Sequence, residues 1–409
     1  MTFKNLQLNS AMLRAVKRVG YSEPTPIQFR AIPHILNGRD IVGCAETGSG
    51  KTAAFALPIV QMLEPDPGKL RTRVLVLAPT RELAAQIDEE FGKLSRETSI
   101  RHVAIFGGVG QQPQVKALKR GVDIVVATPG RLQDLIDQGF VRLDQIEFFV
   151  LDEADRMLDM GFINDVKRII NRLPKRRQTM LFSATMPQAI QDLSKSILTD
   201  PVKVEANPHS TTVENVAQSI YFVEGGDKRA LLKHILQDPA SERVLVFTRT
   251  KHRANRLAQQ LNRARIPAEA IHGNKSQTAR TNALSRFKSG RTAVLVATDI
   301  AARGLDIDAV THVINFDLPN LPESYVHRIG RTARAGASGF ACSFCDVDER
   351  KYLNGIEELI RQPIPVVADH PYMSAIEAPK PAQAAKKAPR QNRRRRVRRS
   401  RGNRQTHTA

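Results

Sequence analysis

Two short segments carry the residue types that phosphate and metal-ion chemistry require. The first, AETGSGKT at residues 45–52, is rich in glycine and ends in Lys51 and Thr52. Glycine lets backbone N–H groups close around phosphate oxygens, a lysine can bridge the terminal phosphates, and a hydroxyl can bind Mg²⁺. The segment fits a phosphate-binding loop, with Ala45 where glycine is commoner. We predict that a nucleoside triphosphate is held by Thr47, Gly48, Ser49, Gly50, Lys51 and Thr52, the last also binding the metal.

Two adjacent carboxylates mark the second segment, FFVLDEAD at residues 148–155, where they follow a hydrophobic run. Asp152 is expected to hold Mg²⁺ through water, and Glu153 to orient and deprotonate an attacking water molecule. Taken alone, acidic residues at a strand end are mostly solvated loop charges. Together with the phosphate-binding loop, they predict hydrolysis of a nucleoside triphosphate.

The elements that must position these residues are short apolar strands alternating with amphipathic helices. Continuous apolar runs are typical of strands buried on both faces, and their alternation with helices predicts a parallel sheet. The pattern restarts after residues 206–212, so we predict two α/β domains. The predicted strands are 40–44, 73–78, 123–127, 147–151, 179–182, 243–248, 293–298 and 312–316, and two of the predicted helices are 81–94 and 163–173.

Composition excludes several classes of protein. With 41% hydrophobic residues the chain can form apolar cores, so a wholly disordered protein is excluded. No uninterrupted apolar run is long enough to cross a membrane, and the first residues lack the pattern of a signal peptide. Three cysteines exclude a disulfide framework and favour a reducing cytoplasm. Cys342 and Cys345 lack the second pair that a structural zinc site needs, so we predict that they are buried strand residues.

A strong positive charge points to a polyanionic partner. The chain has 62 Lys and Arg against 41 Asp and Glu, a formal charge of +21. Residues 370–409 hold 12 of these basic residues and one acidic residue, in a composition typical of disorder. This tail is either a solvated segment that aids solubility or an arm that attracts phosphates.

Four segments in order resemble the DEAD-box family of ATP-dependent RNA helicases. They are AETGSGKT (45–52), DEAD (152–155), SAT (183–185) and HRIGRTARAG (327–336). The resemblance spans Phe3 to about Ile364. The segment DEADRMLDMGF (152–162), the compact core and the basic tail are most similar to the bacterial RhlE group.

The resemblance implies α/β architecture with two tandem RecA-like domains, each a mostly parallel sheet with helices on both faces. On this basis we place an ATP-binding domain at residues 1–206, a linker at 207–215 and a second helicase domain at 216–369. A disordered basic tail follows at 370–409.

The adenine end of the ATP site is implied by GYSEPTPIQ (20–28), which is similar to the family's adenine-reading motif. Gln28 would match the N6 and N7 edge of adenine, and Tyr21 would stack on its ring. Phe3 would be the isolated upstream aromatic of the family. Without the resemblance, Phe3 and Tyr21 read as core packing.

The second domain is implied to complete the ATP site. Arg331 and Arg334 would be arginine fingers that stabilise charge on the γ-phosphate. Asp306 would contact the ribose. Ala333 stands where many members have glycine, which we expect to be a mild change.

By the same resemblance, loops that follow strands hold the RNA sugar-phosphate backbone. Such places present N–H groups and guanidinium forks to anions, although a lone arginine after a strand is by default solvated. The implied RNA contacts are Pro79, Thr80, Arg81, Gly107, Gly108, Thr128, Pro129, Gly130, Arg131, Thr248, Arg249, Arg280 and Thr298. The residues implied to couple the two sites are Asp155, Ser183, Thr185, Arg303 and His327.

The predicted function is an RNA-dependent ATPase that unwinds short duplexes or remodels RNA–protein complexes, with ATP and Mg²⁺ as cofactors. The chain has no Trp and 5% aromatic residues, so sequence-independent backbone binding is expected. The ATP site is split between domains, so hydrolysis requires their closure, which ATP and RNA should favour together. Ribosome assembly or RNA turnover is the expected setting. Two alternatives remain, a non-enzymatic RNA clamp or annealing protein and a DNA translocase.

Overall fold

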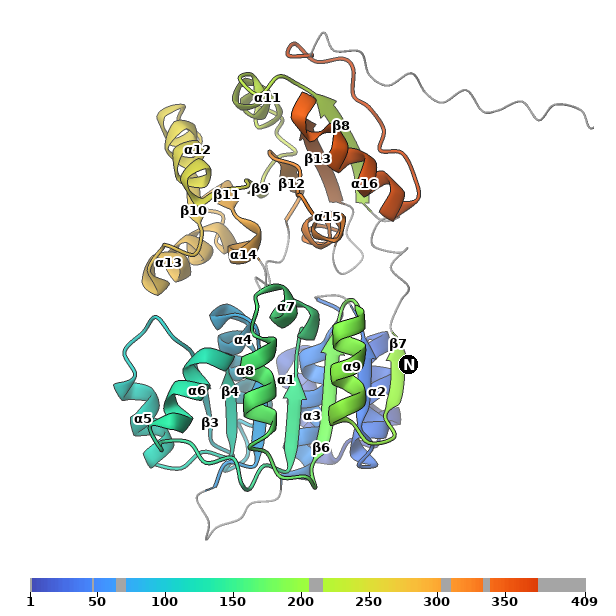
Figure 1. The fold of residues 1–409 in the computed structure, drawn as a ribbon, viewed down its shortest axis with the longest axis vertical. Helices are drawn as coiled ribbons and strands as arrows, with labels where there is room; N and C mark the ends of the chain where they lie inside the picture. The colour runs from blue at the N-terminus through green and yellow to red at the C-terminus, as the bar shows by residue number, and fades with distance from the viewer. Residues whose placement is uncertain are drawn as a thin grey trace, which may run out of the picture.

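The computed structural model describes residues 2–45, 48–63, 71–205, 216–302, 310–333 and 339–373. Figure 1 shows two bodies, each built around a sheet with helices packed on its faces. Neighbouring strands in both sheets run parallel wherever the chain is described. Because parallel strands share one direction, their carboxyl ends meet at one edge of each sheet, and this edge can collect residues from distant parts of the chain.

Within the described residues, the first sheet has seven strands in the order β3-β4-β2-β5-β6-β1-β7. Strands β2, β4 and β5 are buried along their whole length, because helices cover both faces. The strands are β1 (Ile41–Cys44), β2 (Val74–Leu77), β3 (His102–Ile105), β4 (Ile124–Ala127), β5 (Phe148–Leu151), β6 (Gln178–Ser183) and β7 (Val202–Glu205).

Alternate side chains of each strand enter two separate cores. Val74 and Val76 of β2 join one core, whereas Leu75 and Leu77 join the other. The first core is covered by η1 (Phe3–Leu6), α1 (Ser10–Val19), α2 (Pro26–Leu36), α3 (Lys51–Met62) and α4 (Arg81–Leu94). The second is covered by α5 (Gln112–Lys119), α6 (Pro129–Asp137), α7 (Ala154–Asp159), α8 (Ile163–Ile170) and α9 (Gln188–Ile197).

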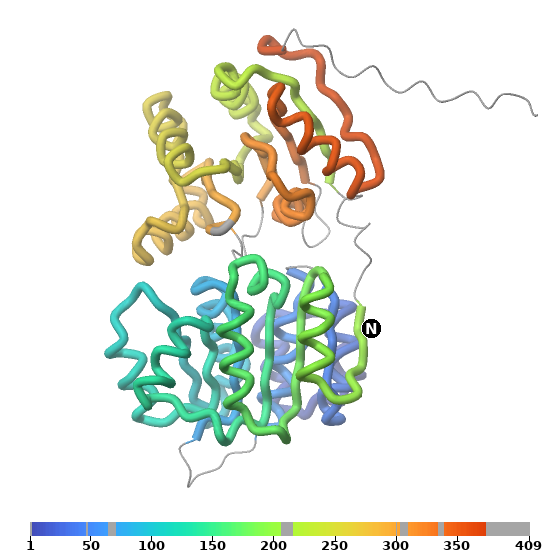
Figure 2. The backbone as a smooth tube through the Cα atoms, in the orientation of Figure 1, coloured from blue at the N-terminus to red at the C-terminus, as the bar shows by residue number. Residues whose placement is uncertain are grey.

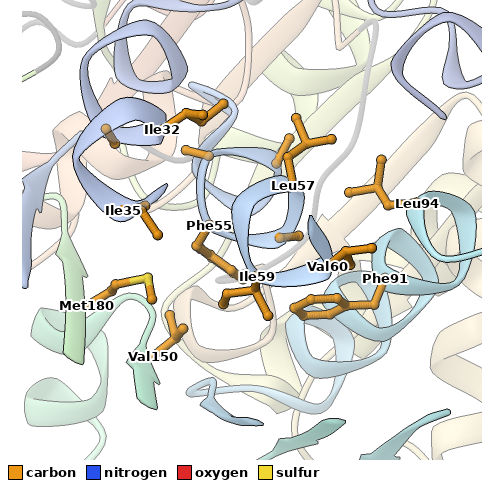
Figure 3. Close-up of a cluster of buried hydrophobic side chains, with 14 of the residues drawn as sticks. Ile32, Ile35, Phe55, Leu57, Ile59, Val60, Phe91, Leu94, Val150 and Met180 are labelled. Atoms are coloured by element: carbon orange, nitrogen blue, oxygen red, sulfur yellow. The ribbon is translucent and has the colours of Figure 1, made fainter. Parts of the chain in front are cut away.

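Helix α3, which begins at Lys51, is anchored in the middle of the first core. Its residues Phe55, Leu57 and Ile59 are fully buried. The start of the helix is therefore fixed relative to the sheet. Figure 3 shows these side chains flanked by Ile32 and Ile35 of α2, Phe91 and Leu94 of α4, and Val150 and Met180 of β5 and β6.

The second sheet has six strands where the chain is described, in the order β10-β11-β9-β12-β13-β8. The strands are β8 (Val216–Phe222), β9 (Val244–Phe247), β10 (Ala268–Ile271), β11 (Val294–Ala297), β12 (His312–Asn315) and β13 (Gly339–Cys345). The helices are α11 (Lys228–Ile235), α12 (Lys251–Arg263), α13 (Gln277–Lys288), α14 (Asp299–Ala302), α15 (Pro322–Ile329), η2 (Val347–Glu349) and α16 (Arg350–Ile360). Cys342 and Cys345 are buried in β13, as predicted.

After α16 the chain turns back along the edge strand β8. The amide of Ile220 donates to the Pro365 carbonyl at 2.9 Å, and the amide of Val367 donates to the Ile220 carbonyl at 3.0 Å. Figure 2 shows this segment, in red, running toward α11, where the ring of Tyr372 lies 6.4 Å from that of His234. The predicted tail lies outside the described residues from position 374 onward.

The predicted fold class is confirmed, because each body is a parallel sheet with helices on both faces. Each predicted strand coincides with an observed strand to within one residue at either end. The helix predicted at 81–94 has those bounds, whereas the one predicted at 163–173 ends at Ile170 and continues as a turn. The predicted linker, 207–215, lies outside the described residues. In the parts of the chain that are described, no helix is long and apolar enough to span a membrane.

Candidate active site

The glycine-rich loop joins β1 to α3 in a conformation that requires glycine. Gly48 and Gly50 have φ angles of +86° and +90°. Residues with a Cβ atom adopt such angles only at a steric cost. A Cβ atom on Gly50 would also lie 2.5 Å from Nε2 of Gln28. Lys51 is only 5% exposed, and its Nζ donates to the carbonyl of Ala45 at 2.8 Å. An ammonium has three donors, so this geometry leaves N–H groups for phosphate oxygens.

Of the residues predicted to read adenine, Gln28 contacts this loop, and Phe3 and Tyr21 stack on each other. Nε2 of Gln28 donates to the Gly50 carbonyl at 3.1 Å, and its Oε1 accepts from the amide of Thr25 at 3.0 Å. The Tyr21 hydroxyl donates to Glu90 at 2.5 Å. Phe3 is 4% exposed and stacks on Tyr21 with ring centroids 6.3 Å apart. Gln28 therefore adjoins the phosphate loop, whereas Phe3 belongs to the core, and its role toward adenine stays a prediction.

Asp152 stands where β5 ends, with 2% of its surface exposed. Burial raises the pKa of its carboxyl group, and the charge of Lys51 opposes that shift. Its Oδ1 atom is buried and has no hydrogen-bond partner among the described residues. A buried oxygen without a partner is costly, and a divalent cation or a water bound to one would satisfy it. The residue present therefore fits the predicted magnesium site.

Glu153 is held in an unusual backbone conformation directly after Asp152. Its φ of +55° lies in the left-handed region, which costs about 1–2 kcal/mol for a residue other than glycine. Burial raises the pKa of its carboxyl group, but positive charges outweigh burial and hold that pKa well below its usual value. In decreasing order, those charges are Arg156, which also forms an ion pair with it, Lys51 and Arg331. Arg331 belongs to the second body, so the pKa of Glu153 is lowered by charges from both bodies.

The predicted coupling residues of the first body form one hydrogen-bonded group. Oδ2 of Asp155 accepts from the amide of Thr185 at 2.8 Å and from its hydroxyl at 2.9 Å. The Ser183 hydroxyl accepts from the Asp155 amide at 3.1 Å, and its carbonyl accepts from the Ala45 amide at 3.1 Å. The ends of β1, β5 and β6 are therefore linked directly. Each of these bonds lies within the first body.

The arginines after residue 327 separate into two roles. Arg328 is 2% exposed and forms a two-point ion pair with Asp299, with N···O distances of 2.6 and 2.8 Å. Helix α15 ends at Ile329, so Arg331 leaves from the turn beyond it, where its Nε donates to the His327 carbonyl at 3.3 Å. Arg328 thus belongs to the interior of its own body, and Arg331 belongs to the site around Glu153.

Ala333 follows Arg331 with a φ of +54°. A methyl group in this left-handed conformation costs about 1 kcal/mol or more relative to glycine. The replacement of glycine is therefore less mild than the sequence led us to expect.

Four predicted site residues lie outside the described residues. They are Arg334, the second predicted arginine finger, and Thr47, Arg303 and Asp306.

In the first body the predicted RNA contacts gather at the carboxyl edge of the sheet. Arg81 lies so close to Gly108 (φ +78°) that a Cβ atom there would overlap its guanidinium group. Burial lowers the pKa of Arg81, the nearby charges of Arg280 and Arg131 lower it further, and the charge of Glu82 opposes this shift. Three guanidinium groups from three segments therefore lie near one another with one carboxylate among them, which leaves an excess of positive charge for an anion. Pro79, Thr80, Gly107, Thr128, Pro129 and Gly130 occupy the loops and helix starts around them.

In the second body the predicted RNA contacts differ in how far they are exposed. Thr248 is fully buried at the end of β9, and Thr298 is half-buried after β11. Arg249 is exposed, but its guanidinium donates to Glu349 at 2.8 Å. His272, which follows β10, is 3% exposed, and neither ring nitrogen has a hydrogen-bond partner among the described residues.

A direct contact between the two bodies involves a residue that the sequence did not single out. Glu82 of α4 forms an ion pair with Arg280 of α13 at 3.0 Å and accepts from Gln277 at 3.1 Å. Both charged side chains are at most 10% exposed. Glu82 is an ordinary first-turn acidic residue in the sequence, and only the second body shows what it contacts.

We expect Glu82→Gln to shift the two bodies toward separation. The amide can still accept from Gln277, but it loses the ion pair with Arg280, and a close charge pair across an interface contributes about 1.5 kcal/mol or more. The equilibrium constant for closure should fall about tenfold, measured by energy transfer between dyes on the two bodies with nucleotide bound. Glu89→Gln, which removes an exposed ion pair on the same helix, is the control. Equal behaviour of the two variants would show that the contact does not hold the bodies together.

Comparison with known proteins places this arrangement among helicases. Residues 25–193 match the family model of the DEAD/DEAH box helicase, and residues 227–336 match that of the helicase conserved C-terminal domain. The chain is 44% identical over 362 residues to the DEAD-box ATP-dependent RNA helicase CshA of Bacillus subtilis (strain 168), covering 88% of this chain and 73% of CshA.

Two solved structures resemble the arrangement of both bodies. The first is S. cerevisiae Dbp5 bound to RNA and ADP BeF3, with a TM-score of 0.81 and 30% identity, covering 90% of this chain and 95% of that one. The second is Mss116p bound to ssRNA and AMP-PNP, with a TM-score of 0.81 and 28% identity, covering 90% of this chain and 79% of that one.

Proposed function

The chain belongs to the DEAD-box family of ATP-dependent RNA helicases, and from this premise we propose how its own residues divide the work. Glu153 orients and deprotonates the attacking water, while Lys51 and the phosphate loop hold the triphosphate. Arg331, with Arg334, stabilises the charge that develops as the γ-phosphoryl group transfers. The observation that carries this proposal is that Arg331 of the second body lies near enough to Glu153 of the first for its charge to lower the pKa of the Glu153 carboxyl group.

Asp152 and Thr52 are the residues that would hold Mg²⁺ with the nucleotide. When bound, the cation neutralises charge on the phosphate oxygens. The proposal is supported by the unpartnered buried oxygen of Asp152 and by the position of Thr52 one residue into α3. Gln28 is proposed to position adenine from beside Gly50, with Tyr21 stacking on the ring, Phe3 as the upstream aromatic and Asp306 contacting the ribose.

RNA is the proposed polyanion, bound as a single strand or short duplex through its sugar-phosphate backbone. Support comes from the guanidinium groups of Arg81, Arg131 and Arg280, which lie together although they arise from both bodies. A strand bound across them would favour closure, and closure brings Arg331 to Glu153, so RNA and ATP should promote each other's binding. Asp155, Ser183, Thr185 and His327 are proposed to couple the sites.

The cellular setting is proposed to be ribosome assembly or RNA turnover in the cytoplasm. We also propose membership of the RhlE group, on the segment at residues 152–162 and the basic tail. The relative described above carries the name CshA, so this finer assignment rests on the residues alone.

The deciding experiment compares ATP hydrolysis with single-stranded RNA, with DNA of matched length and sequence, and with neither. RNA should stimulate turnover and DNA should not. Equal stimulation by both would favour a DNA translocase. Strand annealing without nucleotide, together with ATPase activity that neither polymer changes, would favour a non-enzymatic clamp.

A further inference from the structure

A buried group of charges in the second body lies outside the ATP site. We call it the Lys228 cluster. It joins the start of α11 to the loops that follow β9, β12 and β13. Its members are Lys228, Arg249, Arg253, Asp317, Asp346 and Glu349.

Lys228 is the centre of this cluster and has no exposed surface. Its Nζ lies 2.5 Å from Glu349, 3.3 Å from Asp346 and 3.9 Å from Asp317. A buried ammonium is costly unless carboxylates surround it. The cluster has three positive and three negative groups, so its formal charge is zero only while Lys228 is present.

Asp317 and Glu349, the two most buried carboxylates of the cluster, also accept hydrogen bonds from the loop after β9. Oδ2 of Asp317 accepts from the backbone amide of Arg249 at 2.9 Å. Oε1 of Glu349 accepts from the Arg249 guanidinium at 2.8 Å and from the Leu318 amide at 3.2 Å. The backbone and side chain of Arg249 are therefore hydrogen-bonded to two carboxylates, and both carboxylates lie within 3.9 Å of the Lys228 ammonium.

The same acids also fix the helix that follows the loop. Arg253, in the first turn of α12, forms an ion pair with Asp317 at 2.9 Å. Thr250 between them caps α12, accepting from the Arg253 amide at 3.2 Å. The loop from Thr248 to Thr250 thus has little freedom, although its guanidinium side chain is 42% exposed.

We propose that Lys228 is a positioning residue for nucleic acid, because it holds the loop after β9 in the geometry that binds the phosphate backbone. The inference rests on the proposed RNA contacts of Thr248 and Arg249. Without Lys228, the cluster carries a net negative charge beneath a surface that receives a polyanion. Asp317 and Glu349 would then separate and release the Arg249 amide.

Lys228→Met tests the proposal, because it keeps the length of the side chain and removes its charge. The concentration of a uridine homopolymer that gives half-maximal ATPase stimulation should rise about tenfold, as expected when charge-assisted hydrogen bonds to the loop are lost. ATPase activity without RNA and the KM for ATP should stay at wild-type values. Hydrogen exchange at the Arg249 and Leu318 amides should become faster.

Leu232→Ala is the matched control, because it removes apolar packing from the same helix without touching the cluster. It should lower the melting temperature without changing the half-maximal RNA concentration.

Two outcomes would overturn the proposal. One is an unchanged half-maximal RNA concentration in Lys228→Met, and the other is an equal change in Lys228→Met and Leu232→Ala. If Lys228→Met does not fold, Glu349→Gln alone should raise the half-maximal RNA concentration, and an unchanged value there would also overturn it. A wild-type ATPase that RNA does not stimulate would instead contradict the proposed function, so the two failures are distinguishable.

Discussion

Glu153→Gln should reduce ATP turnover by roughly a hundred- to ten-thousand-fold, the contribution of a well-placed general base. Glutamine keeps the size of the side chain but cannot take a proton from water. ATP and RNA should still bind, because neither the phosphate loop nor the RNA contacts change. Single-turnover hydrolysis and equilibrium binding of a fluorescent nucleotide would measure the two effects separately.

The ion pair with Arg156 provides a control for this result. Arg156→Gln removes that partner but leaves the Glu153 carboxylate and the charges of Lys51 and Arg331. It should retain far more turnover than Glu153→Gln. Wild-type turnover in Glu153→Gln would exclude this residue as the base and turn attention to Asp152.

Arg331→Ala should reduce turnover by about a thousandfold or more, as expected for an arginine finger. The side chain comes from the turn after α15, and its charge acts on Glu153 of the other body. The loss should appear in kcat at saturating ATP and RNA, while the melting temperature changes little. Steady-state ATPase assays with thermal unfolding would check both.

Arg328→Ala should have the opposite signature, because Arg328 is held inside its own body by Asp299 and Asn315. Removing one partner of a buried ion pair typically costs about 3–5 kcal/mol of stability. The melting temperature should therefore fall sharply. If Arg331→Ala destabilises the protein as much as Arg328→Ala and leaves kcat unchanged, the assignment of the finger is wrong.

The strands were predictable because both faces of each sheet are covered. Val74 to Leu77 are all buried, so the run is continuously apolar and its bounds can be read directly. The phosphate loop was predictable for a related reason. Gly48 and Gly50 adopt φ angles that other residues avoid, so the backbone conformation of the loop requires glycine at these positions and can be recognised from them.

The residues that sequence reasoning missed depend on partners far along the chain. Glu82 meets Arg280 across nearly 200 residues, with a separation of 195 to its neighbour Gln277. Lys228 reaches Glu349 at a separation of 121 residues. In the sequence each is one of many charged residues on a helix, and such side chains are usually exposed to water. Nothing local therefore marks them as buried ion-pair partners.

The sequence by itself determined the α/β fold class, the phosphate loop and the pair of acidic residues that follows a strand. Each of these depends on local backbone geometry or on continuous burial, which neighbouring residues encode. The tertiary structure alone decided that Arg328 pairs with Asp299 inside its own body, that Glu82 contacts the second body, and that Lys228 lies among the acids next to the loop after β9. The energy of a charge depends on what lies within a few ångströms of it, and only the folded chain brings those partners together.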